Sequence, residues 1–198
     1  MTQEITRQRL VTEFIDRITA YDYMEEFRLL GLSKEKKRQD FISQYRPLVV
    51  LLWSQALDYV HKTRARQIMD MFMSRLYQRL AGSGGQTDYR RIRKGLVDYS
   101  EYCKEENGLV LIAARLVDSA SGVKTGRGEK VKLLTTRIIQ TLKDFVDELS
   151  AVRIVEEGGD LFFEEPAVTN RDLRPRKADE VAPAPDDSLS DTPVYPFA

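Results

Sequence analysis

The sequence has very few of the residues that most often form metal or catalytic centres. It contains one histidine, His61, and one cysteine, Cys103. A single cysteine excludes an internal disulfide, and with it a disulfide-stapled secreted domain. A zinc site made of several histidine and cysteine ligands is also excluded within one chain. We therefore expect no metal site, no cofactor and no enzymatic activity.

Long apolar runs are also lacking. The longest, residues 48–53, is far shorter than the roughly 20 apolar residues that a helix needs to cross a bilayer. The beginning of the sequence lacks the basic and then apolar pattern of a secretory signal peptide, and no lipidation motif is present. These features predict a soluble cytoplasmic protein without a membrane partner.

Proline is scarce in most of the chain and concentrated at one end. Pro47 is the only proline before Pro166, and the other six all lie within residues 166–198. That last segment is also rich in aspartate, and its composition is typical of disordered chains. We therefore predict a helical domain over residues 1–165 and a disordered acidic tail over residues 166–198.

The net charge of zero conceals an uneven distribution. Residues 1–155 hold 27 basic and 20 acidic side chains, a net charge of +7, whereas residues 156–198 hold 4 and 11, a net charge of −7. A basic body with an acidic tail indicates either a body that binds polyanions or two parts that attract each other. The alternative is an acidic tail that serves only solubility.

Apolar side chains recur at intervals of three and four positions through most of residues 3–151, which is the spacing of amphipathic helices. Breaks in this pattern occur at Gly31, residues 81–85, residues 107–108 and residues 121–128. The segments between them predict an irregular bundle of five to seven helices. Residues 48–60 are apolar on most sides and should form the most buried helix.

The limits and faces of individual helices follow from the same pattern. The first predicted helix spans residues 3–30 and ends at Gly31, because glycine suits the left-handed conformation after a helix. Pro47 predicts either a kink or a new helix start, since proline lacks the N–H donor of a helix interior. The helix predicted over residues 129–151 carries its apolar stripe at Val131, Leu134, Ile138, Leu142, Phe145 and Leu149.

After residue 151 the apolar period changes. Residues 152–155 alternate, residues 156–160 suit a turn and residues 161–163 are apolar again, which predicts a small β-hairpin near residues 152–163. The alternative is a frayed helix followed by an extended strap. A long helix followed by a hairpin resembles the recognition helix and wing of winged-helix domains, over residues 129–163. Its basic residues Lys130, Lys132 and Arg137 suit groove contact, whereas the acidic residues of its second half oppose it.

The most prominent functional feature is a basic cluster between residues 61 and 94. It holds nine lysines and arginines against two aspartates, and arginine has a planar fork that suits phosphate. A basic, glycine-rich loop leads into the helix predicted from residue 129, and its backbone amides and cations would also hold an anion. The predicted nucleic-acid-binding residues are Lys62, Arg64, Arg66, Arg90, Arg91, Arg93, Lys94, Lys124, Arg127 and Lys130. The alternatives are a solvated helical face and an ordinary interhelical loop.

Three smaller features have functional and structural interpretations. Asp58 and His61 share a helix face and are predicted to be a surface pair, and Cys103 lies on an apolar stripe that predicts a core thiol. A Cys103–His61 nucleophile pair stays open. At the end of the tail, Val194, Tyr195 and Phe197 follow acidic residues and are predicted to dock on a partner protein. That end resembles the acidic tip of bacterial single-strand-binding proteins; the alternative is an inert tail.

Together these features predict a non-catalytic accessory or assembly subunit of a nucleic-acid-associated complex. The arginine-rich helical surface would contact the phosphates of DNA or RNA, and apolar helix faces would contact other protein subunits or a second copy of the chain. The alternative is a protein–protein adaptor or chaperone without nucleic-acid contact, in which the basic face meets an acidic partner.

Overall fold

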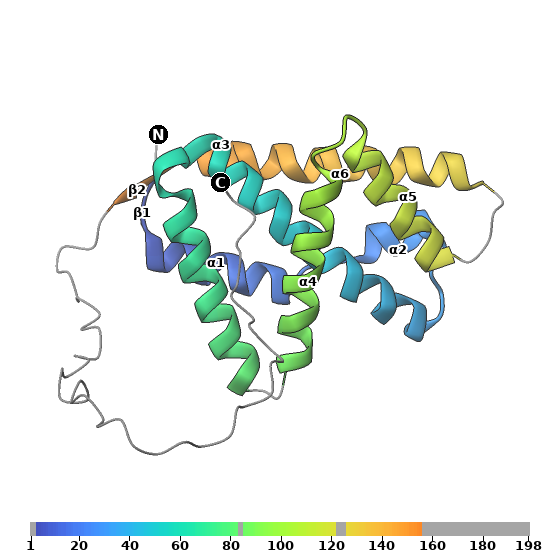
Figure 1. Cartoon of the computed structure of the whole chain (residues 1–198), viewed down its shortest axis with the longest axis horizontal. Helices are drawn as coiled ribbons and strands as arrows, with labels where there is room; N and C mark the ends of the chain where they lie inside the picture. The colour runs from blue at the N-terminus through green and yellow to red at the C-terminus, as the bar shows by residue number, and fades with distance from the viewer. Residues whose placement is uncertain (1–2, 83–84, 122–125, 156–198) are drawn as a thin grey trace, which may run out of the picture. The chain divides into compact units, whose positions relative to one another are not determined.

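The computed structural model describes residues 3–82, 85–121 and 126–155 of the chain (Figure 1). Its elements in chain order are β1 (Gln3–Thr6), α1 (Arg7–Thr19), α2 (Met24–Leu30), α3 (Glu35–Gly82), α4 (Gln86–Tyr102), α5 (Gly108–Ser121), α6 (Arg127–Ser150) and β2 (Val152–Val155). The described part is thus mostly helical, as predicted. The predicted tail, residues 166–198, lies outside the described residues, and so do Val194, Tyr195 and Phe197.

The N-terminal region begins with a strand where the spacing had predicted a single helix over residues 3–30. Thr6 caps α1, because its hydroxyl accepts a hydrogen bond from the Arg9 N–H at 3.2 Å. The chain then breaks before α2, which ends at Gly31 as predicted. Gly31 has a φ of 71°, and the Leu32 N–H donates to the Phe27 carbonyl at 2.8 Å, which is the Schellman arrangement.

Helix α3 runs through Pro47 and kinks further along, at His61, where φ is −121° and ψ is 32°. We call residues 35–60 the first arm and residues 62–82 the second arm; Figure 1 shows the second arm turning back beside β1 and β2. No proline or glycine lies near His61, so the kink has neither of these local causes. The Arg64 guanidinium donates to the Ile154 carbonyl at 2.5 Å and fixes the start of the second arm against β2.

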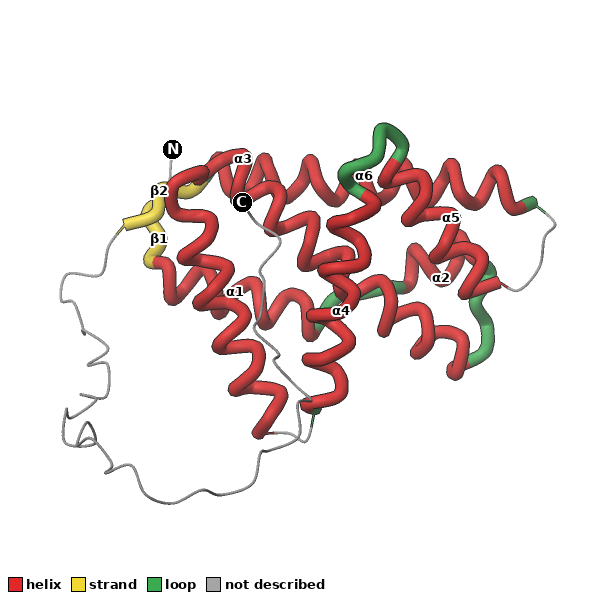
Figure 2. Tube along the Cα trace, in the orientation of Figure 1, coloured by secondary structure: helices red, strands yellow, loops and turns green. Residues whose placement is uncertain are grey.

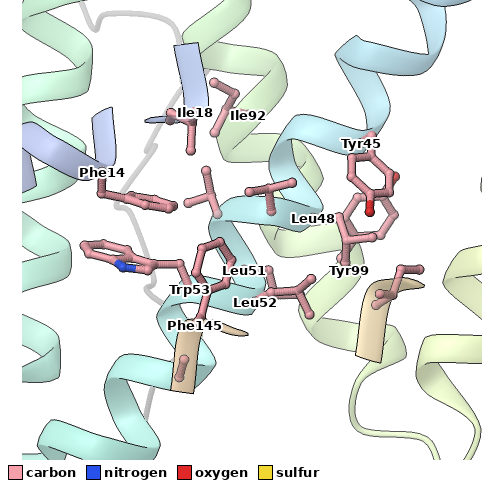
Figure 3. Packing of buried hydrophobic residues seen from close by; sticks show 14 of the residues in the cluster. Phe14, Ile18, Tyr45, Leu48, Leu51, Leu52, Trp53, Ile92, Tyr99 and Phe145 are labelled. Atoms are coloured by element: carbon pink, nitrogen blue, oxygen red, sulfur yellow. The ribbon is translucent and has the colours of Figure 1, made fainter. Parts of the chain in front are cut away.

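Helix α3 is the centre of the fold, and it packs against α1, α4, α5 and α6. Residues 48–54 and 56–57 are buried, as predicted for the stretch 48–60, whereas Asp58 and Tyr59 at its end are exposed. Phe14 of α1 stacks on Trp53 with ring centroids 3.9 Å apart (Figure 3). The ring of Phe145 of α6 meets the Phe14 ring edge-on, with centroids 5.8 Å apart. Of the stripe predicted for α6, Leu142 is only half-buried, and Thr141 lies in the core beside it.

Gly95 allows α4 to approach the first arm closely. A Cβ atom at this position would lie 2.5 Å from Cβ and 2.7 Å from Cγ of Pro47, whose ring is buried and rigid. One turn later the Tyr99 hydroxyl donates to the Gln44 carbonyl at 3.0 Å. The absence of a side chain at Gly95 therefore sets the distance between α4 and α3.

We expect Gly95→Ala to lower the free energy of unfolding by up to about 2 kcal/mol. Overpacking against Pro47 costs about 1–3 kcal/mol and outweighs the roughly 1 kcal/mol that alanine gains in a helix interior. Urea denaturation provides the measurement. Gly128→Ala in the first turn of α6 is the matched control, because no atom lies within 4 Å of its new methyl group; this variant should be neutral or slightly more stable. Equal effects of the two substitutions would contradict the close approach.

The two strands form a parallel pair, with Gln3 opposite Val152 and Thr6 opposite Val155 (Figure 2). The predicted strand over residues 152–155 is therefore present, but its partner is the N-terminal strand β1. A hairpin would instead pair it antiparallel with residues 161–163, and those residues lie outside the described part. The comparison with a winged helix thus gains no support from β2.

Candidate nucleic-acid interface

The structure separates the basic cluster into two groups. Lys62, Arg64 and Arg66 lie at the start of the second arm, next to β2, and residues 90–94 lie in the first half of α4. The far end of the second arm contacts α4 where the rings of Tyr77 and Tyr89 meet at 5.1 Å. The stretch from Arg64 to Tyr77 is about 20 Å long at 1.5 Å per residue, so the two groups do not form one continuous patch.

Two further arginines of the cluster are used to hold helices together. Arg75 donates to the main-chain carbonyl of Gln8 at 3.1 Å and to the Gln8 side-chain carbonyl at 3.0 Å. Arg79 pairs with Asp16 at 2.5 Å. Because both partners belong to α1, these arginines fix α1 against the second arm.

In the first group, Arg64 has a comparable structural role. Its guanidinium donates to the Ile154 carbonyl, as described above. Lys62 and Arg66, on either side of it, have exposed side chains. The first group therefore presents Lys62 and Arg66 to solvent, with Arg64 fixed between them.

The glycine-rich loop does not present a free cationic site in its described part. Arg127 forms a two-pronged pair with Asp118, at 2.6 and 2.9 Å, and the guanidinium lowers the pKa of the Asp118 carboxyl. Lys130 donates to the Leu30 carbonyl at 3.2 Å. Lys124, the third predicted residue, lies outside the described residues. Both described cations thus have intramolecular partners.

Arg137, which suited a recognition helix, is likewise an internal residue. It pairs with Glu26 at 3.2 Å and with Glu25 at 2.9 Å, both from α2. Glu26 is fully buried, and the Tyr21 hydroxyl donates to the same carboxylate oxygen at 3.0 Å. Burial, together with the Glu26 charge, raises the pKa of Tyr21 to about 12, so the phenol keeps its proton. Sequence reasoning missed this cluster because its members lie far apart in the chain.

The second group of the basic cluster, residues 90–94 of α4, differs from the cations above because most of it has no intramolecular partner in the described ranges. Arg90, Arg93 and Lys94 are exposed and lie three and four positions apart, so they share one face of α4, which we call the basic face. The opposite face, with Ile92 and Tyr99, is buried. No hydrogen bond or ion pair joins the basic face to any residue of the described ranges. Arg91 points to the side and pairs with Asp88 at 3.6 Å.

Exposed apolar side chains flank the basic face. Val97 lies one turn beyond Arg93 and Lys94 on the same face of α4 and is 44% exposed. Tyr77 of the second arm is 45% exposed, and it contacts Tyr89, the residue before Arg90. Sequence reasoning missed Tyr77; the signal for it is that Leu76 is buried and that adjacent residues of a helix lie on different sides of it.

The Cys103–His61 nucleophile pair, which the sequence left open, has no support in the structure. Burial raises the pKa of the Cys103 thiol, which keeps it protonated and a poor nucleophile. Its side chain is half-buried and packs against the core, as predicted for a core thiol. Burial lowers the pKa of His61, which lies at the kink, and neither a hydrogen bond nor an ion pair joins it to Asp58 within the described ranges.

The described residues hold neither a metal-binding cluster nor a membrane-spanning helix. Residues 3–82, 85–121 and 126–155 contain no group of three or more His, Cys, Asp and Glu side chains placed to hold a metal ion. Within the same ranges, every helix is too short or too polar to cross a membrane.

Comparison with known proteins does not assign this chain to a family. No family model, curated protein or solved structure matches this chain.

Proposed function

We propose that this chain is a non-catalytic accessory subunit of a cytoplasmic nucleic-acid-associated complex and that the basic face of α4 contacts the phosphate backbone. One observation carries the proposal: Arg90, Arg93 and Lys94 project from a single exposed face without partners in the described part of the chain. The neighbouring arginines Arg75 and Arg79 serve packing and would not take part.

The chemistry of the face fits phosphate oxygens. Two guanidinium groups and one ammonium group offer charge-assisted donors, and they are held on a helix whose other face is buried. Contacts of this kind are independent of sequence and release counterions, so the affinity falls steeply with salt. The exposed Tyr77 ring beside the face would stack on unpaired bases, which favours single strands over duplex.

The triple variant Arg90→Ala/Arg93→Ala/Lys94→Ala is expected to bind single-stranded DNA or RNA at least about tenfold more weakly at low salt. Three lost phosphate contacts should also flatten the plot of log affinity against log salt by roughly two units. Fluorescence anisotropy titrations of the full-length protein at several salt concentrations measure both quantities.

The matched control is Arg28→Ala/Lys132→Ala/Lys143→Ala. It removes the same formal charge from exposed side chains of α2 and α6 and should retain wild-type binding. If both triple variants lose the same affinity, the binding is general electrostatic attraction and not a property of α4. If the wild-type chain binds no nucleic acid at low salt, the proposal fails, and a protein–protein adaptor becomes the better description.

A further inference from the structure

The kink of α3 produces a concave site that the proposed α4 interface does not use. A cavity of about 930 Å³ lies where the start of the second arm meets the two strands. Its lining residues are Glu4, residues 59–64 and residues 152–155. The volume lies in the range of small-molecule sites, which is roughly 300–1,000 Å³, and it is much larger than a single phosphate group.

The walls of the cavity are held in place by hydrogen bonding. The Arg64 guanidinium joins the second arm to the Ile154 carbonyl at 2.5 Å, and β2 is paired along its length with β1. Glu4 and Arg153 are opposite each other in that pairing. The three segments that form the site are therefore fixed relative to one another before any ligand arrives.

The charge of the lining is positive. Among the described lining residues, Lys62, Arg64 and Arg153 contribute three cations, and Glu4 contributes the one carboxylate. The Glu4–Arg153 pair is long, 3.8 Å, and both side chains are mostly exposed, so an incoming anion would displace Glu4 at little cost. Nε2 of His61 is buried at this site without a hydrogen-bond partner in the described ranges and would offer a further polar contact.

The aromatic ring of Tyr59 also lines this cavity. Tyr59 is 72% exposed, the largest exposed fraction among the big apolar side chains of the described residues. Tyr59 precedes the kink and Lys62 follows it, and both line the cavity. An exposed ring beside several cations is the combination that binds a nucleobase by stacking and its phosphate by charge.

We propose that this cavity binds a nucleoside phosphate, with the base on Tyr59 and the phosphate on Lys62 and Arg153. Arg64 is kept in its structural role. A free mononucleotide and the terminal nucleotide of a strand share this chemistry. The proposal does not depend on the basic face of α4, which lies beyond the other end of the second arm.

Isothermal titration of the full-length protein with AMP, UMP and inorganic phosphate tests the site. Both nucleotides should bind saturably, and Lys62→Ala/Arg153→Ala should weaken their binding about tenfold or more. Tyr59→Leu should weaken nucleotide binding and leave phosphate binding unchanged, and Tyr59→Phe should restore the nucleotide affinity because a phenyl ring still stacks. Circular dichroism and melting temperatures verify that each variant is folded.

Titrations with oligonucleotides that carry or lack a 5′-phosphate distinguish a site for strand ends from a site for free nucleotides. A preference for the 5′-phosphorylated strand over AMP would assign the site to strand ends, and the reverse would assign it to free nucleotides. The Arg90→Ala/Arg93→Ala/Lys94→Ala variant should bind AMP like the wild type, so failure of the α4 proposal leaves this one standing. The absence of saturable nucleotide binding to wild-type protein at millimolar concentration would overturn it, as would equal affinities of the wild type, Tyr59→Leu and Lys62→Ala/Arg153→Ala.

Discussion

Phe14→Ala is expected to lower the free energy of unfolding by about 3–5 kcal/mol, the usual cost of truncating a buried phenylalanine. Phe14 is 4% exposed and stacks on Trp53 at 3.9 Å. Its ring also contacts Phe72 of the second arm at 5.3 Å and Phe145 of α6 at 5.8 Å. One side chain thus joins α1, both arms of α3 and α6. The surrounding aromatic rings are closely packed and rigid, so they cannot move in to fill the cavity that its removal leaves.

Urea or guanidinium denaturation measures the effect, and Tyr59→Ala is the matched control. It removes an aromatic ring of similar size from a position that is 72% exposed, so the cost should stay below about 1 kcal/mol. A Phe14→Ala variant no less stable than Tyr59→Ala would show that α1 does not pack on Trp53 as described.

The helices were predictable because local spacing determines which side chains share a face. Phe14 and Ile18 are four positions apart, and both lie in the core where the pattern placed them. The C-terminal end of α2 was also predictable, since Gly31 has the left-handed conformation that favours glycine. These features depend on residues close together in the sequence.

Features that depend on distant residues could not be predicted in this way. The four residues of β1 are strand because they pair with β2, about 150 positions away, and the local pattern alone extended the first helix through them. The kink of α3 is at His61, close to the hydrogen bond between Arg64 and Ile154, whereas Pro47 had been the local reason to expect a break. Thr141 takes a core position beside Leu142 for the same kind of reason, since burial depends on the neighbouring helices.

The candidate interface was likewise predictable only where it depends on residues close together in the sequence. Sequence proximity grouped nine cations, but the fold uses Arg75 and Arg79 to hold α1 and leaves the basic face of α4 without partners among the residues that the structure describes. Charge counts alone do not distinguish a packing arginine from a free one, because the difference lies in which acceptor the fold brings near. The cavity beside Tyr59 was not predicted at all, since two of its walls come from opposite ends of the described chain.

Arg137→Ala is expected to lower the free energy of unfolding by about 3–5 kcal/mol, because it leaves a buried carboxylate without its cation. Glu26 is 0% exposed, and one of its oxygens, Oε1, receives hydrogen bonds from Arg137 at 3.2 Å and Tyr21 at 3.0 Å. The other oxygen, Oε2, has no partner in the described ranges, so Arg137 supplies the only charge compensation at hydrogen-bond distance. The pair also fixes α2 against α6.

Two companion variants separate the effect of the unpaired charge from the loss of contacts. Arg153→Ala breaks the exposed pair with Glu4 and should cost less than about 1 kcal/mol, because solvent screens both charges. Glu26→Leu/Arg137→Met replaces the buried pair with apolar side chains of similar length and should recover at least about half of the stability lost in Arg137→Ala. Thermal and chemical denaturation measure all three variants. If the double variant is less stable than Arg137→Ala, the cost lies in the lost hydrogen bonds and packing and not in the unpaired charge of Glu26.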